Sequence, residues 1–117
     1  MNTKLLGAFG EQSAARFLRQ QGYEIFSNNF LISSGELDIV AFKNNTLCFV
    51  EVKTRGEGGM FSPAEAVDFR KQENLKSAAT AYINRYKLKY DYRFDIIEVI
   101  VDNAQNVTNI NHIENAF

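Results

Sequence analysis

The stretch that decides the fold is residues 35–55, GELDIVAFKNNTLCFVEVKTR. Two runs rich in apolar and β-branched residues flank an Asn-Asn pair at 44–45. Asparagine tolerates the positive φ angles that tight hairpin turns require. The pattern therefore predicts a β-hairpin with strands at about 36–42 and 46–54.

The register of this hairpin brings charged side chains together. A two-residue or four-residue loop centred on the Asn pair places Asp38 opposite Glu51 and Glu36 opposite Lys53, whereas a three-residue loop shifts the register by one. Like charges that face each other across a ladder destabilise it, so two facing carboxylates need a proton, a Lys or Arg, or a metal ion between them. Glu51 and Lys53 are two residues apart and project from the same face. We expect two acids and an ammonium group to converge there.

Toward the turn, both faces of the hairpin are apolar. On one face Leu37 would pair with Val52, Ile39 with Val50 and Ala41 with Cys48. On the other face Val40 would pair with Phe49 and Phe42 with Leu47. Apolar residues on both faces are typical of central strands that are covered on two sides.

Helical patterns lie on either side of the hairpin. An apolar stripe over about residues 5–21 predicts a helix that stops at Gly22. Residues 62–65, Ser-Pro-Ala-Glu, have the form of a capping box and predict the start of a helical pattern that runs to about Tyr86. Within this pattern Asp68 is a candidate cap for a further helix after a break.

The remaining segments have the patterns of strands and connections. We expect short extended pieces at 23–26 and 30–32 separated by a break at Asn28-Asn29, a Gly-rich loop at 55–59, and strands at 93–101 and 107–113. The order helix, strands, helix, strands predicts an α/β fold with a mixed sheet and helices on both of its faces.

Length and composition limit the class of protein. The chain has 117 residues, which predicts one domain over 1–117, and 45% of them are hydrophobic. A single cysteine, Cys48, excludes an internal disulfide and fits a reducing compartment. The sequence has no long apolar segment at its N-terminus and no stretch that could span a bilayer. We therefore expect a cytoplasmic protein with no membrane contact.

The converging acids suggest a metal site. Hard oxygen ligands suit Mg²⁺ or Mn²⁺. Asp38 and Glu51 would supply ligands, and the carbonyl of Val52 another. Lys53 would orient or deprotonate a water, or stabilise charge on phosphorus. Glu11 shares a helical stripe with apolar residues, so it either completes the metal shell or sits at the rim of that stripe bonded to Arg or water.

Other charged residues have less definite roles. Lys71 lies on the apolar side of the second helix and either points toward the acids or is simply exposed. With Arg55 and Arg70 it forms the predicted set of contacts to nucleic acid. Asp95 is expected to be structural or to support the site, and His112 is expected to take no part in catalysis.

Competing chemistries fit the sequence less well. It has no Ser-His-acid or Cys-His set, no P-loop, no dinucleotide fingerprint and no Cys/His zinc spacing, so no small-molecule cofactor is expected.

The acid pattern resembles that of the PD-(D/E)XK nuclease superfamily. Here it consists of Asp38, then Glu51-Val52-Lys53, with Glu11 on the preceding helix. A wider set of residues resembles the YraN-like family of small bacterial proteins over nearly the full length: Gly7, Gly10-Glu11, Ala14, Gly22-Tyr23, Asn29, Gly35-Glu36-Leu37-Asp38, residues 49–55, residues 64–67, Lys71, Arg93-Phe94-Asp95 and Asn115-Ala116-Phe117.

This resemblance implies a restriction-endonuclease-like fold similar to that of archaeal Holliday junction resolvases. It implies that Glu11, Asp38, Glu51 and Lys53 are the catalytic and metal-binding positions. It also implies DNA as a partner and a homodimer.

The residues and the resemblance leave three interpretations. The first is a Mg²⁺- or Mn²⁺-dependent DNA endonuclease, structure-selective in the manner of junction resolvases. The second is a catalytically silent module of nuclease fold that binds DNA or a repair or uptake protein. The third is a structural ion-pair cluster, which accounts for Glu36 facing Lys53 but leaves Asp38 facing Glu51 unexplained.

Overall fold

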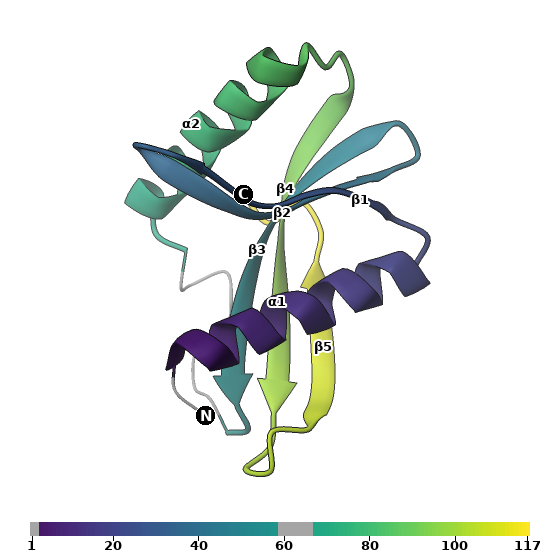
Figure 1. The fold of residues 1–117 in the computed structure, drawn as a ribbon, viewed down its shortest axis with the longest axis vertical. Coiled ribbons are helices and arrows are strands. Elements are labelled where there is room, and N and C mark those ends of the chain that lie inside the picture. Colours follow the sequence, from purple (N-terminus) through teal and green to yellow (C-terminus); the bar gives the residue numbers. More distant parts are fainter. Residues whose placement is uncertain (1–2, 59–66) are drawn as a thin grey trace.

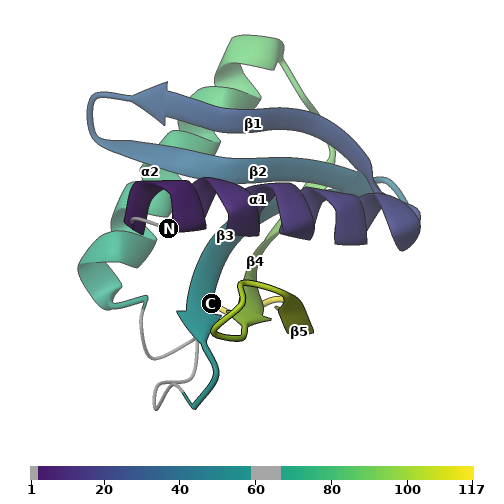
Figure 2. The ribbon, with the colours of Figure 1, turned by 60° about the horizontal axis from the view of Figure 1, so that its bottom comes forward.

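In the computed structural model, which describes residues 3–58 and 67–117, a five-stranded sheet carries one helix on each face (Figures 1 and 2). The elements follow the chain as α1 (Thr3–Gln20), β1 (Glu24–Ile32), β2 (Gly35–Lys43), β3 (Thr46–Gly56), α2 (Phe69–Tyr86), β4 (Asp91–Val101) and β5 (Val107–Ile113). Strand order in the sheet is the same as in the chain. β3 and β4 are parallel, and the other neighbours are antiparallel. The predicted α/β class is confirmed, and the arrangement is consistent with a restriction-endonuclease-like fold.

The hairpin of β2 and β3 has the predicted turn and register up to its midpoint. Asn44 and Asn45 have φ angles of 51° and 62°, as a two-residue turn of this kind requires. The paired residues run from Lys43 and Thr46 at the turn to Ile39 and Val50.

Beyond Ile39 and Val50 the predicted ladder is wrong. Among the described residues, the pairing of β2 with β3 ends there, so Glu36 does not face Lys53 across a ladder. The physical reason is that the Asp38 side chain accepts the backbone N–H of Val52, which a continued ladder would have directed to the backbone of β2. Leu37 also changes sides and packs with the core beneath α2 instead of with Ile39.

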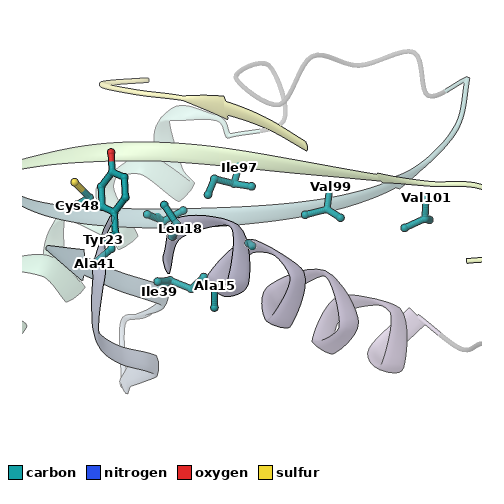
Figure 3. Packing of buried hydrophobic residues seen from close by; sticks show 11 residues of the cluster. Ala15, Leu18, Tyr23, Ile39, Ala41, Cys48, Ile97, Val99 and Val101 are labelled. Carbon is teal, nitrogen blue, oxygen red and sulfur yellow. The ribbon is translucent and has the colours of Figure 1, made fainter. Parts of the chain in front are cut away.

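The sheet separates two apolar layers, as the two-sided hairpin predicted. On one face Ala15 and Leu18 of α1 pack against Ile39 and Ile97 (Figure 3). On the other face α2 covers a second cluster that contains Val40, Leu47, Phe49, Leu75, Ala78, Ala79, Phe94 and Ile96. The two layers hold the central strands rigidly, so side chains on β2 and β3 have fixed positions.

Close backbone approach sets where α1 crosses β3. A Cβ on Gly10 would overlap the side chain of Thr54, so only glycine permits this spacing. At the other end of the helix, Gly22 has a φ of 92° and ends it as predicted.

α2 begins after Asp68, the position at which the sequence predicted the cap of a helix that follows a break. Asp68 is its N-cap, and the Asp68 carboxylate accepts the backbone N–H of Lys71 at 2.9 Å. The predicted capping box at 62–65 lies outside the described residues. The predicted loop at 55–59 is wrong at its beginning, because β3 continues through Gly56 by pairing with β4.

The predicted break at Asn28-Asn29 is also wrong. β1 is continuous from Glu24 to Ile32, and its irregularity is a bulge between Ile25 and Ser27. Asn29 does adopt a positive φ of 55°. The strand accommodates this because it pairs with β2 alone among the described strands and is therefore an edge.

No helix in the described ranges is long and apolar enough to cross a membrane.

Candidate active site

Glu51 lies at the centre of the site. It is on β3, where it pairs in register with Ile96 of β4, and it is only 5% exposed. Its Oε1 atom lies 3.6 Å from the Nζ of Lys53 and 3.5 Å from the Nζ of Lys71. Lys53 follows two residues later on the same face of β3, and Lys71 reaches across from the first turn of α2. Two ammonium groups therefore stabilise one buried carboxylate through the same oxygen.

The second oxygen of Glu51 is left without a partner. Oε2 is buried and has no hydrogen-bond partner within the part of the chain that the structure describes. Burying a charged oxygen without a hydrogen-bond partner lowers the stability of the fold, so the unpaired Oε2 atom requires an explanation. A cation or a donated proton at this atom would satisfy it.

Asp38 stands beside Glu51 and is held by the backbone of the next residue. Its Oδ2 accepts the N–H of Val52 at 2.9 Å, and the residue is 7% exposed. Burial and the negative charge of Glu51 raise the pKa of Asp38 to about 7, although the Val52 N–H and Lys71 oppose the rise. A proton therefore sits readily on Asp38 at neutral pH when no cation is bound.

Glu11 approaches the pair from α1, on the other side of the sheet from Lys71. Burial raises its pKa, the charge of Asp38 raises it further, and a hydrogen bond from the Asn29 side chain opposes the rise. Asp38 thus interacts with an acid on each side, Glu11 and Glu51. The helical stripe left two roles open for Glu11, and no sequence pattern indicated an interaction with Asn29.

These groups fit a divalent cation of the hard kind. Within the described residues, no three Asp, Glu, His or Cys side chains converge closely enough to form a complete cage. Mg²⁺ typically takes one or two carboxylates and fills its remaining positions with water and substrate phosphate. The bare Oε2 of Glu51 next to the Asp38 carboxylate matches that requirement. Which residues hold a metal stays a prediction.

An ion pair that the sequence did not predict lies further along β3. The Nε of Arg55 is 3.3 Å from an oxygen of Glu98 on β4, and the Nδ2 of Asn111 donates to the other oxygen of Glu98 at 3.2 Å. Glu98 is buried and pairs in register with Lys53. Only the parallel register of β3 with β4 places Glu98 here, and no local sequence signal encodes that register.

The predicted nucleic-acid contacts have different surroundings. Lys71 is part of the site, since its ammonium contacts Glu51. Arg55 is engaged with Glu98. Arg70 is exposed on the first turn of α2. Whether any of them touches nucleic acid stays a prediction.

Asp95 and His112 belong to a separate network beneath α1. The Asp95 carboxylate is 0% exposed and is bound by His112 at 2.8 Å, by the Arg93 Nε at 3.0 Å and by the backbone N–H of Asn115 at 3.0 Å. Burial alone would raise the pKa of Asp95, but these donors outweigh it and hold the pKa below its usual range. The network ties β5 and the C-terminal segment to β4, so Asp95 has the structural one of its two predicted roles. That His112 takes no part in catalysis stays a prediction.

Comparison with protein families gives a match over most of the chain. The model of the Uncharacterised protein family UPF0102 matches residues 10–99. This range contains every candidate site residue named above, from Glu11 to Glu98.

Individual relatives are similar over their full length. UPF0102 proteins of Caldicellulosiruptor bescii and Caldicellulosiruptor saccharolyticus are 47% and 45% identical to the chain, with 100% of both chains covered in each case. A UPF0102 protein of Caldanaerobacter subterraneus subsp. tengcongensis is 44% identical over 100% of this chain and 98% of its own. These matches confirm the resemblance to the YraN-like family.

Proposed function

We propose that this chain, which belongs to the uncharacterised protein family UPF0102, is a metal-dependent endonuclease that hydrolyses phosphodiester bonds in DNA. One observation carries the proposal. A buried carboxylate, Glu51, has two ammonium groups on one oxygen and a bare second oxygen beside another carboxylate, Asp38. A structural ion pair needs no bare oxygen, whereas a metal-assisted hydrolytic site does.

The cation would be held by the two carboxylates. Asp38 and Glu51 are the predicted ligands, with the carbonyl oxygen of Val52 and the carboxylate of Glu11 as further predicted donors. Bound Mg²⁺ or Mn²⁺ would polarise a phosphate oxygen and lower the pKa of a water molecule. Without the cation, a proton on Asp38 would reduce the repulsion between the Asp38 and Glu51 carboxylates, which is consistent with the Asp38 pKa of about 7.

The two lysines supply the positive charge that phosphoryl chemistry requires. The ammonium group of Lys53, fixed by β3 next to Glu51, would orient the attacking water or stabilise the charge that develops on the phosphate oxygens. Lys71 would add a second donor from α2. Water forms the new bond to phosphorus, and the departing sugar oxygen takes up a proton.

The substrate is proposed to be a DNA structure rather than a sequence, in the manner of junction resolvases. The test is a cleavage assay with Mn²⁺ or Mg²⁺ on four-way junction, flap, single-stranded and linear duplex DNA of matched sequence, with EDTA as the blank. We expect metal-dependent cutting with a preference for the junction. Cutting of all four substrates at equal rates would contradict the proposed selectivity for DNA structure and would still support the nuclease activity.

A folded protein that binds none of the metals and cuts none of the substrates would overturn the proposal. Its site would then serve a catalytically silent module of nuclease fold. Calorimetry with Mn²⁺ on the same preparation measures metal binding directly and keeps this outcome separate from a poor choice of substrate.

A further inference from the structure

Side chains of α1 and of the edge strand β1 line a polar groove on the face of the sheet that α1 covers. Its volume is about 490 Å³. The lining consists mostly of polar side chains from three turns of α1 and the middle of β1: Ala8, Glu11, Gln12, Ala15, Arg16, Arg19, Asn28 and Asn29. The groove therefore offers charge and hydrogen bonds instead of an apolar surface.

Two arginines give the groove its positive charge. Arg16 and Arg19 are exposed, and neither has an ion-pair partner among the residues in 3–58 and 67–117. They are three residues apart on α1, so they project from the same side of the helix. By contrast, Arg93 pairs with Asp95 and Glu114. Arginine forms bidentate contacts with phosphate, and an unpaired arginine is available for them.

The remaining polar groups of the groove suit a sugar-phosphate chain. Gln12, Asn28 and Asn29 present amide groups that can donate and accept hydrogen bonds, as is common in contacts to DNA backbone. Glu11, one of the predicted acids of the active site, lines the groove as well. The polar lining is therefore connected to the acids of the candidate active site.

The groove leads toward that site. Glu11 lines it, and so do Asn28 and Asn29, which lie in the part of β1 that pairs with residues 37–39 of β2, the stretch centred on Asp38. From Glu11 to Arg19 the helix rises about 12 Å, at roughly 1.5 Å per residue. Measured along the axis of duplex DNA, each strand carries one phosphate per roughly 3.4 Å, so this length spans about three to four phosphates of one strand.

We propose that this groove binds the phosphodiester backbone of the DNA strand that enters the active site, with Arg16 and Arg19 contacting successive phosphates. The inference rests on the proposed function, and it names residues outside the predicted contact set of Arg55, Arg70 and Lys71. Arg16 and Arg19 are positioning residues: they hold the strand, and the reacting phosphate lies beyond them at Asp38 and Glu51.

The test measures DNA binding without cleavage. Fluorescence anisotropy with labelled single-stranded and four-way junction DNA is recorded in EDTA over a salt series of about 50–200 mM. The variants are R16Q, R19Q and their combination. The matched control is R85Q, which removes an exposed arginine that lies over the Tyr86 ring at the far end of α2.

We expect each groove variant to weaken binding about ten-fold at about 0.1 M salt, and to lower the slope of log affinity against log salt by roughly 0.7–0.9. R85Q is expected to bind like the wild type. A double variant with wild-type affinity and salt slope would overturn the proposal. So would displacement of the DNA by micromolar inorganic phosphate, which would mark a site for the free anion.

Cleavage by the same variants separates this inference from the proposed function. If the wild type binds DNA through the two arginines but never cuts it with Mn²⁺, the result supports DNA binding by the groove and contradicts the proposed nuclease activity. If the wild type cuts DNA and the double variant binds and cuts it equally well, the result supports the nuclease activity and contradicts DNA binding by the groove.

Discussion

The carboxylate of Asp38 on β2 accepts the backbone N–H of Val52 on β3 at 2.9 Å, and Val52 is the residue between Glu51 and Lys53. This single bond ends the pairing of the two strands and fixes Asp38 beside Glu51. A side chain has taken the place of a backbone acceptor where the two strands separate. The opening that results is where the acids and the ammonium groups meet.

Asp38→Asn should stabilise the metal-free protein at neutral pH. The folded pKa of Asp38, about 7, lies above the ordinary value near 3.8, so the folded state binds the proton more tightly. Stability then falls as pH rises between these two values, and the neutral amide of the variant escapes this loss while its oxygen still accepts the Val52 N–H. We expect a gain of about 2–4 kcal/mol at pH 8, since each pKa unit corresponds to about 1.4 kcal/mol.

Urea unfolding of both proteins in EDTA checks this prediction across pH. The two unfolding free energies should converge toward pH 4 and separate as the pH rises. A variant that is less stable than the wild type at pH 8 would show that Asp38 carries no such penalty.

The two lysines should differ in their effect on catalysis. Lys53→Met is expected to reduce cleavage by about 100-fold or more, because the ammonium group proposed to orient the water or to stabilise charge on the phosphate is lost. Lys71→Met should cost about ten-fold, since Lys53 remains on the same oxygen of Glu51. Initial cleavage rates at saturating Mn²⁺ provide the measurement.

Lys76→Met is the matched control for the lysine variants. Lys76 lies on α2 and pairs with Glu73, away from the site. If it slowed cleavage as much as Lys71→Met does, the effect of Lys71 would reflect the overall charge of α2 and not its contact with Glu51.

Asp95→Asn should destabilise the fold. The carboxylate is fully buried and receives hydrogen bonds from His112, Arg93 and Asn115, so its neutral replacement loses charge-assisted bonds and leaves Arg93 poorly paired. We expect a loss of about 3–5 kcal/mol at pH 7.

The pH dependence separates the Asp95 network from the active site. Because the pKa of Asp95 is lowered on folding, its contribution is fully present above about pH 4 and is lost as pH falls through the folded pKa. Chemical unfolding at pH 7 and in acid should therefore show the variant approaching the wild type in acid. A constant difference across this range would contradict the ionised network.

Gly10→Ala should displace α1 from β3. The added methyl group would overlap the Thr54 side chain, so the helix must move and carry Glu11 with it. Overpacking of this kind costs about 1–3 kcal/mol. Gly7→Ala, three residues earlier on α1, is the control, because a Cβ at Gly7 meets no atom within 4 Å. Thermal unfolding compares the two, and equal stability of both variants would contradict the close approach.

The sequence encodes the central hairpin well because its signals are local. Asn44 and Asn45 set the turn, the turn sets the register as far as Ile39 and Val50, and the apolar alternation sets the two covered faces. Gly22 and Asp68 likewise mark helix ends through their own backbone and side-chain chemistry.

The sequence predicts less where distant groups compete. The end of the ladder depends on whether Val52 bonds the β2 backbone or the Asp38 side chain, and periodicity carries no information on that choice. Glu98 reaches the site only through the parallel register of β3 with β4, which is set by a crossover through α2. The interpretation of Asn29 as a break was wrong because a bulged edge strand tolerates a positive φ.

The most direct test of the nuclease is the comparison of wild-type protein with Glu51→Gln. The variant keeps the size of the side chain but removes the charge that holds Lys53, Lys71 and the predicted cation. With Mn²⁺ and four-way junction DNA, we expect the wild type to cut and the variant to lose at least about 100-fold in rate together with its Mn²⁺ binding. Cleavage by Glu51→Gln at the wild-type rate would contradict the assignment of this site.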